Sequence, residues 1–145
     1  MTNHALASTS FAVYCLRLSP GEDLKENLQR FTQRHSLAAG CIVTAVGSLQ
    51  QANLRFAGQD TSTALSQRFE IISLVGTLSL NGLHLHMAIA DEQGHTLGGH
   101  VMPGCLIYTT AEIVVGSLSG VTFHRALDRQ TGYRELVMEK AENRR

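Results

Sequence analysis

The sequence of 145 residues has no tryptophan, only two prolines and only three cysteines. An odd number of cysteines cannot complete a disulfide framework, and Cys15, Cys41 and Cys105 each lie in apolar sequence. Buried free thiols are typical of proteins in a reducing compartment. The sequence therefore argues against a secreted protein stapled by disulfides.

Charged residues are also scarce. They make up 17% of the chain, and 12 basic residues balance 12 acidic ones. A protein that neutralises several phosphates usually has a basic surplus or a basic stripe, whereas the arginines here are scattered and only Arg144 and Arg145 adjoin. The composition therefore disfavours nucleic-acid binding by general attraction, although a symmetric oligomer could assemble a local basic patch.

Long apolar runs are missing as well. No segment approaches the ~20 apolar residues that a membrane-spanning helix needs, and the run MTNHALASTS lacks the basic start and apolar stretch of a signal peptide. The sequence thus predicts no membrane partner and a cytoplasmic location. Because no linker-like segment divides the chain, we expect a flexible leader over 1–10, one domain over 11–138 and a polar tail over 139–145.

One amphipathic helix is predicted near the start of the domain. Leu24, Leu28 and Phe31 recur at helical spacing. The preceding Ser19-Pro20-Gly21-Glu22 has the form of a helix start with Ser19 as its cap. We therefore expect a helix from about residue 21 to about 35, ending before Gly40.

Most of the remaining chain has the pattern of β-strands separated by Gly, Asn and Asp. Asn81-Gly82 predicts a hairpin with a type I′ turn, because both residues tolerate positive φ. The expected strands are 11–18, 41–46, 52–56, 69–80, 83–90, 100–102, 106–115, 121–126 and 134–138. One main amphipathic helix packed on a mainly antiparallel β-sheet gives an α+β fold in one compact domain.

Three histidines are predicted to meet on one face of a hairpin. His84 and His86 are separated by one residue, so they point to the same side of a strand. If the following loop is centred on Gln93, His86 lies opposite His100, and such partners have Cβ atoms about 4.5–5.5 Å apart. A loop of even length would instead turn His100 to the other face, unless a bulge near Gly98 intervened.

Three neutral imidazoles with one open position suit Zn²⁺, and would also accept Ni²⁺, Cu²⁺, Fe²⁺ or Mn²⁺. A carboxylate is expected beside the ligands, with Glu70 and Glu112 as candidates. Arg17, in an apolar strand, is a candidate for binding an anionic ligand next to the metal. The plainer alternative is that His84 and His86 are solvated residues on a half-exposed strand.

The chain resembles the plants-and-prokaryotes conserved (PPC) domain over roughly residues 10–138. The resemblance is carried by Gly76-Thr77-Leu78-Ser79, Gly82-Leu83-His84-Leu85-His86, Ala90-Asp91, Gly94, Gly98-Gly99-His100, Arg17 with Gly21-Glu22-Asp23, Gly47-Ser48, and Tyr108-Thr109-Thr110-Ala111-Glu112. It implies a homotrimer with a metal site at His84, His86 and His100. It also implies a fold similar to that of acetolactate decarboxylase, an enzyme that holds zinc through three histidines.

Two functions follow as hypotheses. In plants the PPC domain accompanies AT-hook motifs, and bacterial stand-alone members are described as DNA-binding. The resemblance therefore implies a metal-binding, oligomeric module with a regulatory or DNA-associated role. This sequence has no Arg-Gly-Arg-Pro hook, so no matched residue carries DNA binding over. The alternative is a zinc-dependent lyase or hydrolase acting on a small anionic metabolite, with the metal polarising a carbonyl or activating water. The sequence leaves open whether the protein is an enzyme.

Overall fold

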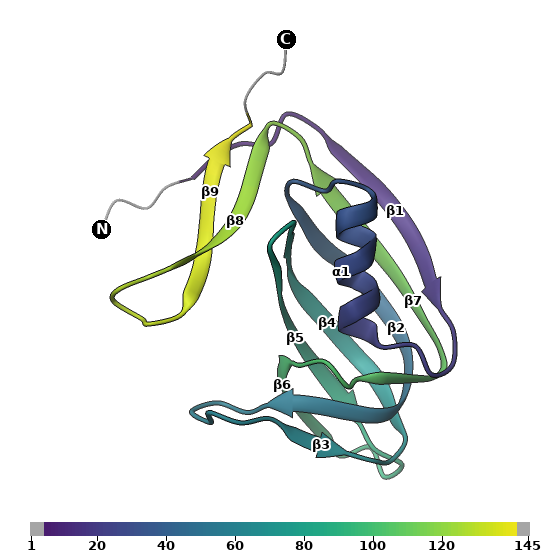
Figure 1. Ribbon diagram of the computed structural model, residues 1–145. Coiled ribbons are helices and arrows are strands. Elements are labelled where there is room, and N and C mark those ends of the chain that lie inside the picture. The colour runs from purple at the N-terminus through teal and green to yellow at the C-terminus, as the bar shows by residue number, and fades with distance from the viewer. Residues whose placement is uncertain (1–4, 142–145) are drawn as a thin grey trace.

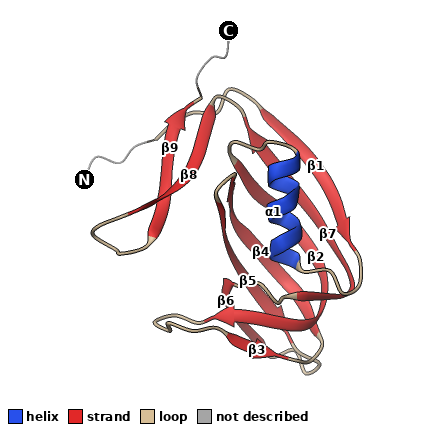
Figure 2. Cartoon of the chain, viewed as in Figure 1, coloured by secondary structure: helices blue, strands red, loops and turns tan. Residues whose placement is uncertain are grey.

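The computed structural model describes residues 5–141, and its elements confirm the predicted α+β class (Figure 1). Strands dominate the described chain, and a single α-helix accompanies them (Figure 2). In chain order the elements are β1 (Phe11–Leu18), α1 (Leu24–Arg34), β2 (Gly40–Arg55), β3 (Thr63–Leu65), β4 (Phe69–Ser79), β5 (Gly82–Ala90), β6 (Thr96–Val101), β7 (Leu106–Leu118), β8 (Val121–Leu127) and β9 (Arg134–Lys140).

Seven strands form one antiparallel sheet in the order β1-β7-β2-β4-β5-β6, with β3 paired to β2. The long strand β2 pairs with β4 along its first part and with β6 at Leu54 and Arg55. The sheet therefore curls until its β6 edge meets the end of β2. Strands β8 and β9 form a separate two-stranded hairpin that packs near β4.

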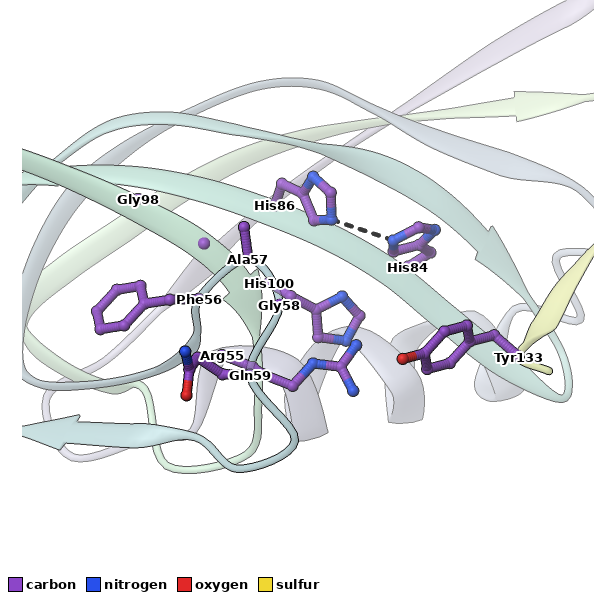
Figure 3. A pocket seen from close by; sticks show the side chains of 11 residues that line it. Arg55, Phe56, Ala57, Gly58, Gln59, His84, His86, Gly98, His100 and Tyr133 are labelled. Carbon is purple, nitrogen blue, oxygen red and sulfur yellow. Dashed lines mark hydrogen bonds between the residues drawn. The ribbon is translucent and has the colours of Figure 1, made fainter. Parts of the chain in front are cut away.

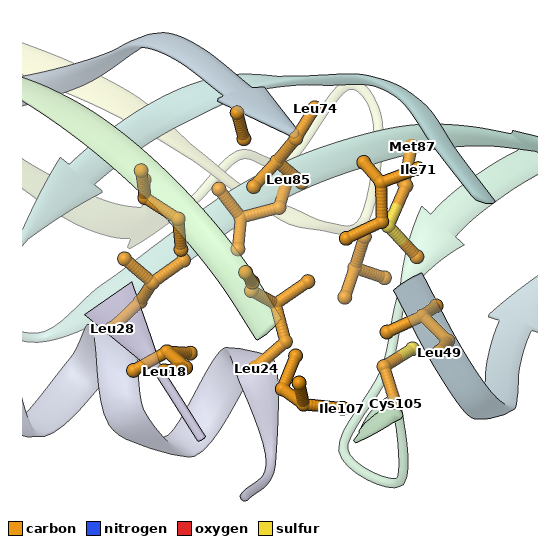
Figure 4. Packing of buried hydrophobic residues seen from close by; sticks show 14 of the residues in the cluster. Leu18, Leu24, Leu28, Leu49, Ile71, Leu74, Leu85, Met87, Cys105 and Ile107 are labelled. Carbon is orange, nitrogen blue, oxygen red and sulfur yellow. The ribbon is translucent and has the colours of Figure 1, made fainter. Parts of the chain in front are cut away.

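The hydrophobic core lies between α1 and one face of this curled sheet (Figure 4). Leu24 and Leu28 of α1 are fully buried, as their helical spacing predicts. On β5 the alternate residues Leu85, Met87 and Ile89 enter the same core. Because successive strand residues face opposite sides, His84 and His86 must point away from it. Packing of one face thus decides the direction of the histidines.

The predicted helix start is wrong by several residues. Residues 21 and 22 exchange backbone hydrogen bonds with Ile107 of β7, so they still belong to the sheet edge. The helix begins only at Leu24, and Asp23 caps it by accepting a hydrogen bond from the Glu26 amide at 3.0 Å. Ser19 and Glu22 are nevertheless in contact, because the Glu22 carboxylate accepts a hydrogen bond from the Ser19 N–H. Pairing with a distant strand overrode the local capping signal.

Strand β2 is continuous where two strands were predicted. The predicted gap between strands 41–46 and 52–56 contains Gly47 and Ser48. These two residues lie at a register shift between β2 and β7. A Cβ at Gly47 would collide with the Thr110 carbonyl, and its φ is +153°. Glycine therefore permits a bulge here rather than ending the strand. The short strand β3, within polar sequence, was not predicted.

The turn between β4 and β5 is also different from the prediction. The pair Ser79 and Gly82 closes the ladder, so Leu80 and Asn81 are the two loop residues. Among residues 5–141 the only non-glycine with positive φ is Ser36, which excludes a type I′ turn at Asn81. The hairpin itself is confirmed. The Asn81 side chain instead accepts the Arg125 N–H at 3.0 Å and donates to the Arg125 carbonyl at 3.2 Å.

The ends of the described chain are tied to the fold. In the predicted leader, the Ser8 hydroxyl and the Thr9 N–H both donate to the Ser119 carbonyl. Strand β9 runs to Lys140, two residues into the predicted tail. Residues 1–4 and 142–145 lie outside the described chain. Within it, no helix has the length and apolar character to cross a membrane.

Candidate metal centre

The β5–β6 register confirms the predicted meeting of the three histidines. His86 pairs with His100, and the ladder continues to Ala90 and Thr96, which leaves a loop centred on Gln93. The ladder between these strands is continuous, so no bulge is needed. His84 lies two positions before His86 on the same face.

The three rings face one another closely enough to share an ion. The Nε2 atoms of His84 and His86 are 3.1 Å apart, and one ligand nitrogen from each of the three histidines lies within 4.8 Å of the others. Zinc–nitrogen bonds of about 2.0–2.1 Å in a tetrahedral site place two nitrogens about 3.3 Å apart. The His84–His86 pair already has nearly that spacing, and the ligand nitrogen of His100 lies within 4.8 Å of both.

The environment of the rings also fits a metal. The Nδ1 atom of His100 is buried and has no hydrogen-bond partner among the described residues. Burial, then the positive charges of Lys25 and Arg55, lower the pKa of His100 to about 4. Burial, then the charge of Arg125, also lowers the pKa of His84. Both rings are therefore neutral at pH 7, the state in which imidazole binds metals.

Two glycines allow β6 to carry His100 into this position. A Cβ at Gly98 would lie 2.8 Å from the Met87 carbonyl oxygen, and a Cβ at Gly99 would lie 2.9 Å from that of Arg55. Side chains at either position would push β6 away from its neighbours β5 and β2. The glycines thus serve close backbone approach rather than hairpin flexibility.

A cavity of about 400 Å³ opens beside the histidines (Figure 3). It is lined by Arg55 and Phe56 of the β2 end, by Gly98 and Gly99 of β6, and by Tyr133 before β9. Arg55 pairs with His100 in the β2–β6 ladder, so the two side chains are neighbours on one face. The Arg55 guanidinium also lies 5.9 Å from the Tyr133 ring centroid.

An adjoining cavity of about 360 Å³ extends from the histidines to the β8–β9 hairpin. Arg125 of β8 lines it, is only 7% exposed and donates to the Thr77 hydroxyl. Thr77 pairs with His84 in the β4–β5 ladder, so Arg125 flanks that histidine. Glu135 of β9 lines the same cavity and is the carboxylate that the structure brings near the site.

The three other predicted site residues lie elsewhere. Arg17 and Glu112 are exposed cross-strand partners on β1 and β7. Glu70 is exposed on β4 and lines a separate cavity with Arg68 and Tyr108. None of Arg17, Glu70 and Glu112 lines either histidine cavity.

The structure instead brings Arg55, Arg125, Tyr133 and Glu135 to the histidines, and sequence reasoning missed all four. Local pattern offers no signal for them, because the β8–β9 hairpin and the β2 end reach the site only through tertiary folding. The sequence offers one indication for Arg55, which lies near the end of the predicted strand 52–56 and directly before a polar segment.

Comparisons with known proteins agree with this picture. The family model described as the Plants and Prokaryotes Conserved (PCC) domain, the family abbreviated PPC above, matches residues 6–119. A bifunctional protein GlmU from Synechococcus sp. (strain JA-3-3Ab) is 53% identical over 93% of this chain, which spans 22% of that protein. AT-hook motif nuclear-localized protein 8 from Arabidopsis thaliana is 30% identical over 78% of this chain, which spans 32% of that protein.

Two solved structures cover 94% of this chain and 99% of their own. A hypothetical protein from Salmonella cholerae-suis has 45% identity and a TM-score of 0.91. A metal-containing protein from Archaeoglobus fulgidus has 26% identity and a TM-score of 0.79. The fold is therefore shared over nearly the whole chain.

Proposed function

The chain belongs to the Plants and Prokaryotes Conserved domain family, and we propose that it binds a divalent metal ion, Zn²⁺ above others, through His84, His86 and His100. The observation that carries the proposal is the convergence of three imidazoles around one point, with a buried and unpartnered Nδ1 on His100. The similar protein from Archaeoglobus fulgidus, described as metal-containing, supports it. Three protein ligands leave one position for water or a further ligand.

Metal analysis of the purified protein by plasma mass spectrometry tests this proposal. We expect about one equivalent of metal per chain, the stoichiometry of a three-histidine site. The double variant His84→Ala, His86→Ala should lose it. A matched variant, His95→Ala, removes an exposed loop histidine and should retain the metal. Equal metal in the double variant and the wild type would overturn the proposal.

We further propose a regulatory role in association with DNA for this module. Support comes from the plant relatives, whose names include the AT-hook motif. The formal net charge of zero and the missing hook disfavour direct, high-affinity DNA binding by this chain alone, so the proposed association is through partners or an oligomer. The test is retention on immobilised duplex DNA at low and moderate salt. Phosphate contacts predict retention that falls steeply with salt, and no retention at low salt would remove the DNA component.

A second candidate function is a metal-dependent lyase or hydrolase. It is favoured by the open coordination position beside a cavity of about 400 Å³, a volume typical of small-molecule sites. Glu135 is then the candidate acid or base. Screening the metal-loaded protein against small carboxylic and phosphorylated substrates tests this function. A rate that disappears in both the histidine double variant and Glu135→Gln would support it, whereas no rate for any substrate would count against it.

We also propose that the protein self-associates, as a homotrimer, through the sheet face turned away from α1. Exposed apolar side chains gather on that face, each at least half exposed: Val13, Val43, Val46, Ile72 and Val75. Contiguous apolar surface of this kind marks interaction sites. The patch reaches the histidines, since Val75 pairs with His86 in the β4–β5 ladder.

A further inference from the structure

Positive charge surrounds the histidines without a matching negative charge. Arg55 flanks His100 from β2, and Arg125 flanks His84 through Thr77. Lys25 of α1 adds a third cation, since its Nζ donates at 3.0 Å to the carbonyl of Val101.

Among residues 5–141 the ion pairs within 4.0 Å all involve a histidine, His95 with Asp91 and His124 with Glu139. Arg55, Arg125 and Lys25 therefore have no ion-pair partner in the described chain. Glu135 lines the Arg125 cavity, but its Oε1 accepts a hydrogen bond from the Thr131 hydroxyl at the exposed end of the hairpin. Two carboxylates, Glu135 near Arg125 and Asp23 near Lys25, lie among these three cations, so an excess of positive charge remains.

Arg125 is the most informative of these residues. Its side chain is more than nine-tenths buried, and its Nε is buried without a hydrogen-bond partner among the described residues. A buried donor on a charged group is costly when no acceptor satisfies it. The Asn81 side chain makes two hydrogen bonds to the Arg125 backbone. These bonds fix the part of β8 that carries this guanidinium relative to the β4–β5 turn.

We propose that the cavity of about 360 Å³ between the histidines and the β8–β9 hairpin binds a small oxyanion, a carboxylate or a phosphate group, between the guanidinium groups of Arg55 and Arg125, which both line it. The planar fork of arginine matches both groups in geometry. The Tyr133 ring lines the same cavity and offers contact to the carbon skeleton of an organic anion.

The metal centre strengthens the same preference, and this step rests on the proposed function. Three neutral imidazoles would leave the charge of a divalent ion uncompensated, and His84 and His100 line the same cavity as the two arginines. An anionic oxygen in that position would meet the metal and the guanidinium groups together. A small acid is favoured over a nucleic-acid backbone because the cavity that both arginines line is about 360 Å³ and the protein's net charge is zero.

Calorimetric titration with malonate and with inorganic phosphate tests the inference, and the two arms identify which oxyanion is preferred. It uses metal-free and Co²⁺-loaded full-length protein, with metal content measured in each sample. We expect millimolar or tighter binding to wild-type protein and a change in the visible Co²⁺ absorption. Arg55→Gln and Arg125→Gln should each weaken binding at least about tenfold, the loss expected for one charge-assisted contact, while metal content stays unchanged.

The matched control is Arg17→Gln, which removes an exposed arginine outside both cavities and should bind as the wild type does. If Arg125→Gln does not fold, as circular dichroism would report, Arg55→Gln decides the test. Equal binding by Arg55→Gln and wild type, or no binding of either anion, would overturn the inference. Displacement of the bound anion by a short DNA duplex would overturn it too, because the cations would then serve a nucleic-acid phosphate.

The metal-free titration separates this inference from the proposed function. If the protein holds no metal but still binds an anion through Arg55, the metal proposal fails and the anion site stands. If the protein holds metal but binds no anion, only the anion site fails.

Discussion

His86 lies directly opposite His100 across the β5–β6 ladder, and their ring centroids are 5.7 Å apart. Neither strand could slip by one residue without turning its histidine into the core, where Leu85 and Met87 now pack. The burial of the inner face thus maintains the register that gathers the imidazoles. The candidate site and the core both result from the alternation of side chains along β5, which places the histidines on one face and the core residues on the other.

Removal of His100 should abolish tight metal binding. Loss of a residue that merely supports a ligand costs about 10–100-fold in metal affinity, so loss of a ligand should exceed about 100-fold. Competition with a zinc-sensitive chelator on His100→Ala measures the change. His124→Ala, which removes a histidine near Glu139, is the control and should leave the affinity as it is. An affinity within tenfold of wild type in His100→Ala would contradict the assignment.

The metal-free protein should lose stability as the pH falls. Burial, with Lys25 and Arg55, lowers the pKa of His100 to about 4 in the folded chain, below its ordinary value of 6.5. The unfolded chain therefore takes up the proton first, so the free energy of unfolding decreases between about pH 7 and about pH 4. Urea denaturation after chelator treatment measures this slope. His100→Asn should show a shallower slope, and identical slopes would contradict the prediction.

Gly99→Ala should destabilise the protein and impair the site together. The new Cβ would lie 2.9 Å from the Arg55 carbonyl oxygen, so β2 and β6 must separate. We expect a loss of about 1–3 kcal/mol in the free energy of unfolding, the usual cost of overpacking, and weaker metal binding because β6 carries His100. Denaturant titration and metal analysis measure the two effects. Gly58→Ala is a control without steric contacts, although its φ of +71° adds a small strain of its own.

The thiols of Cys15 and Cys105 should differ sharply in reactivity. Burial raises the pKa of Cys105 to about 11, and its sulfur contacts the Asn53 backbone. Cys15 is exposed on β1. A thiol reagent at pH 8 should therefore modify Cys15 promptly and Cys105 only after unfolding, because the thiolate is the reactive form. Mass spectrometry of partly modified protein reports the order, and early modification of Cys105 in folded protein would contradict it.

Val46→Lys should reduce self-association. Val46 is one of the exposed apolar residues of the proposed interface, is 55% exposed and pairs with Glu112 across β2 and β7. A lysine there is tolerated in a monomer beside that glutamate but is costly in an apolar interface. Light scattering should show a smaller mass than for wild type. Leu127→Lys, on the separate β8–β9 hairpin, should leave the mass unchanged.

Sequence patterns alone were sufficient to predict the α+β class and the helix containing Leu24 and Leu28. They also predicted the pairing of His86 with His100 for a loop centred on Gln93, which the β5–β6 register confirms. Each of these depends on a local period or on loop parity, which neighbouring residues encode. The same local rules failed at Gly21 and Glu22, whose backbone pairs with Ile107 of β7, and at Gly47, where close approach of β7 required a bulge.

The residues that surround the histidines could not be predicted from the sequence, because they reach the site through tertiary contacts. Arg55 reaches His100 because the sheet curls β2 against β6, and Arg125 reaches His84 because the β8–β9 hairpin packs near β4. Glu135 arrives with that hairpin, whereas Glu70, Glu112 and Arg17 stay on distant parts of the sheet. Contacts between segments far apart in the chain depend on the closure of the sheet, and no local pattern encodes that closure.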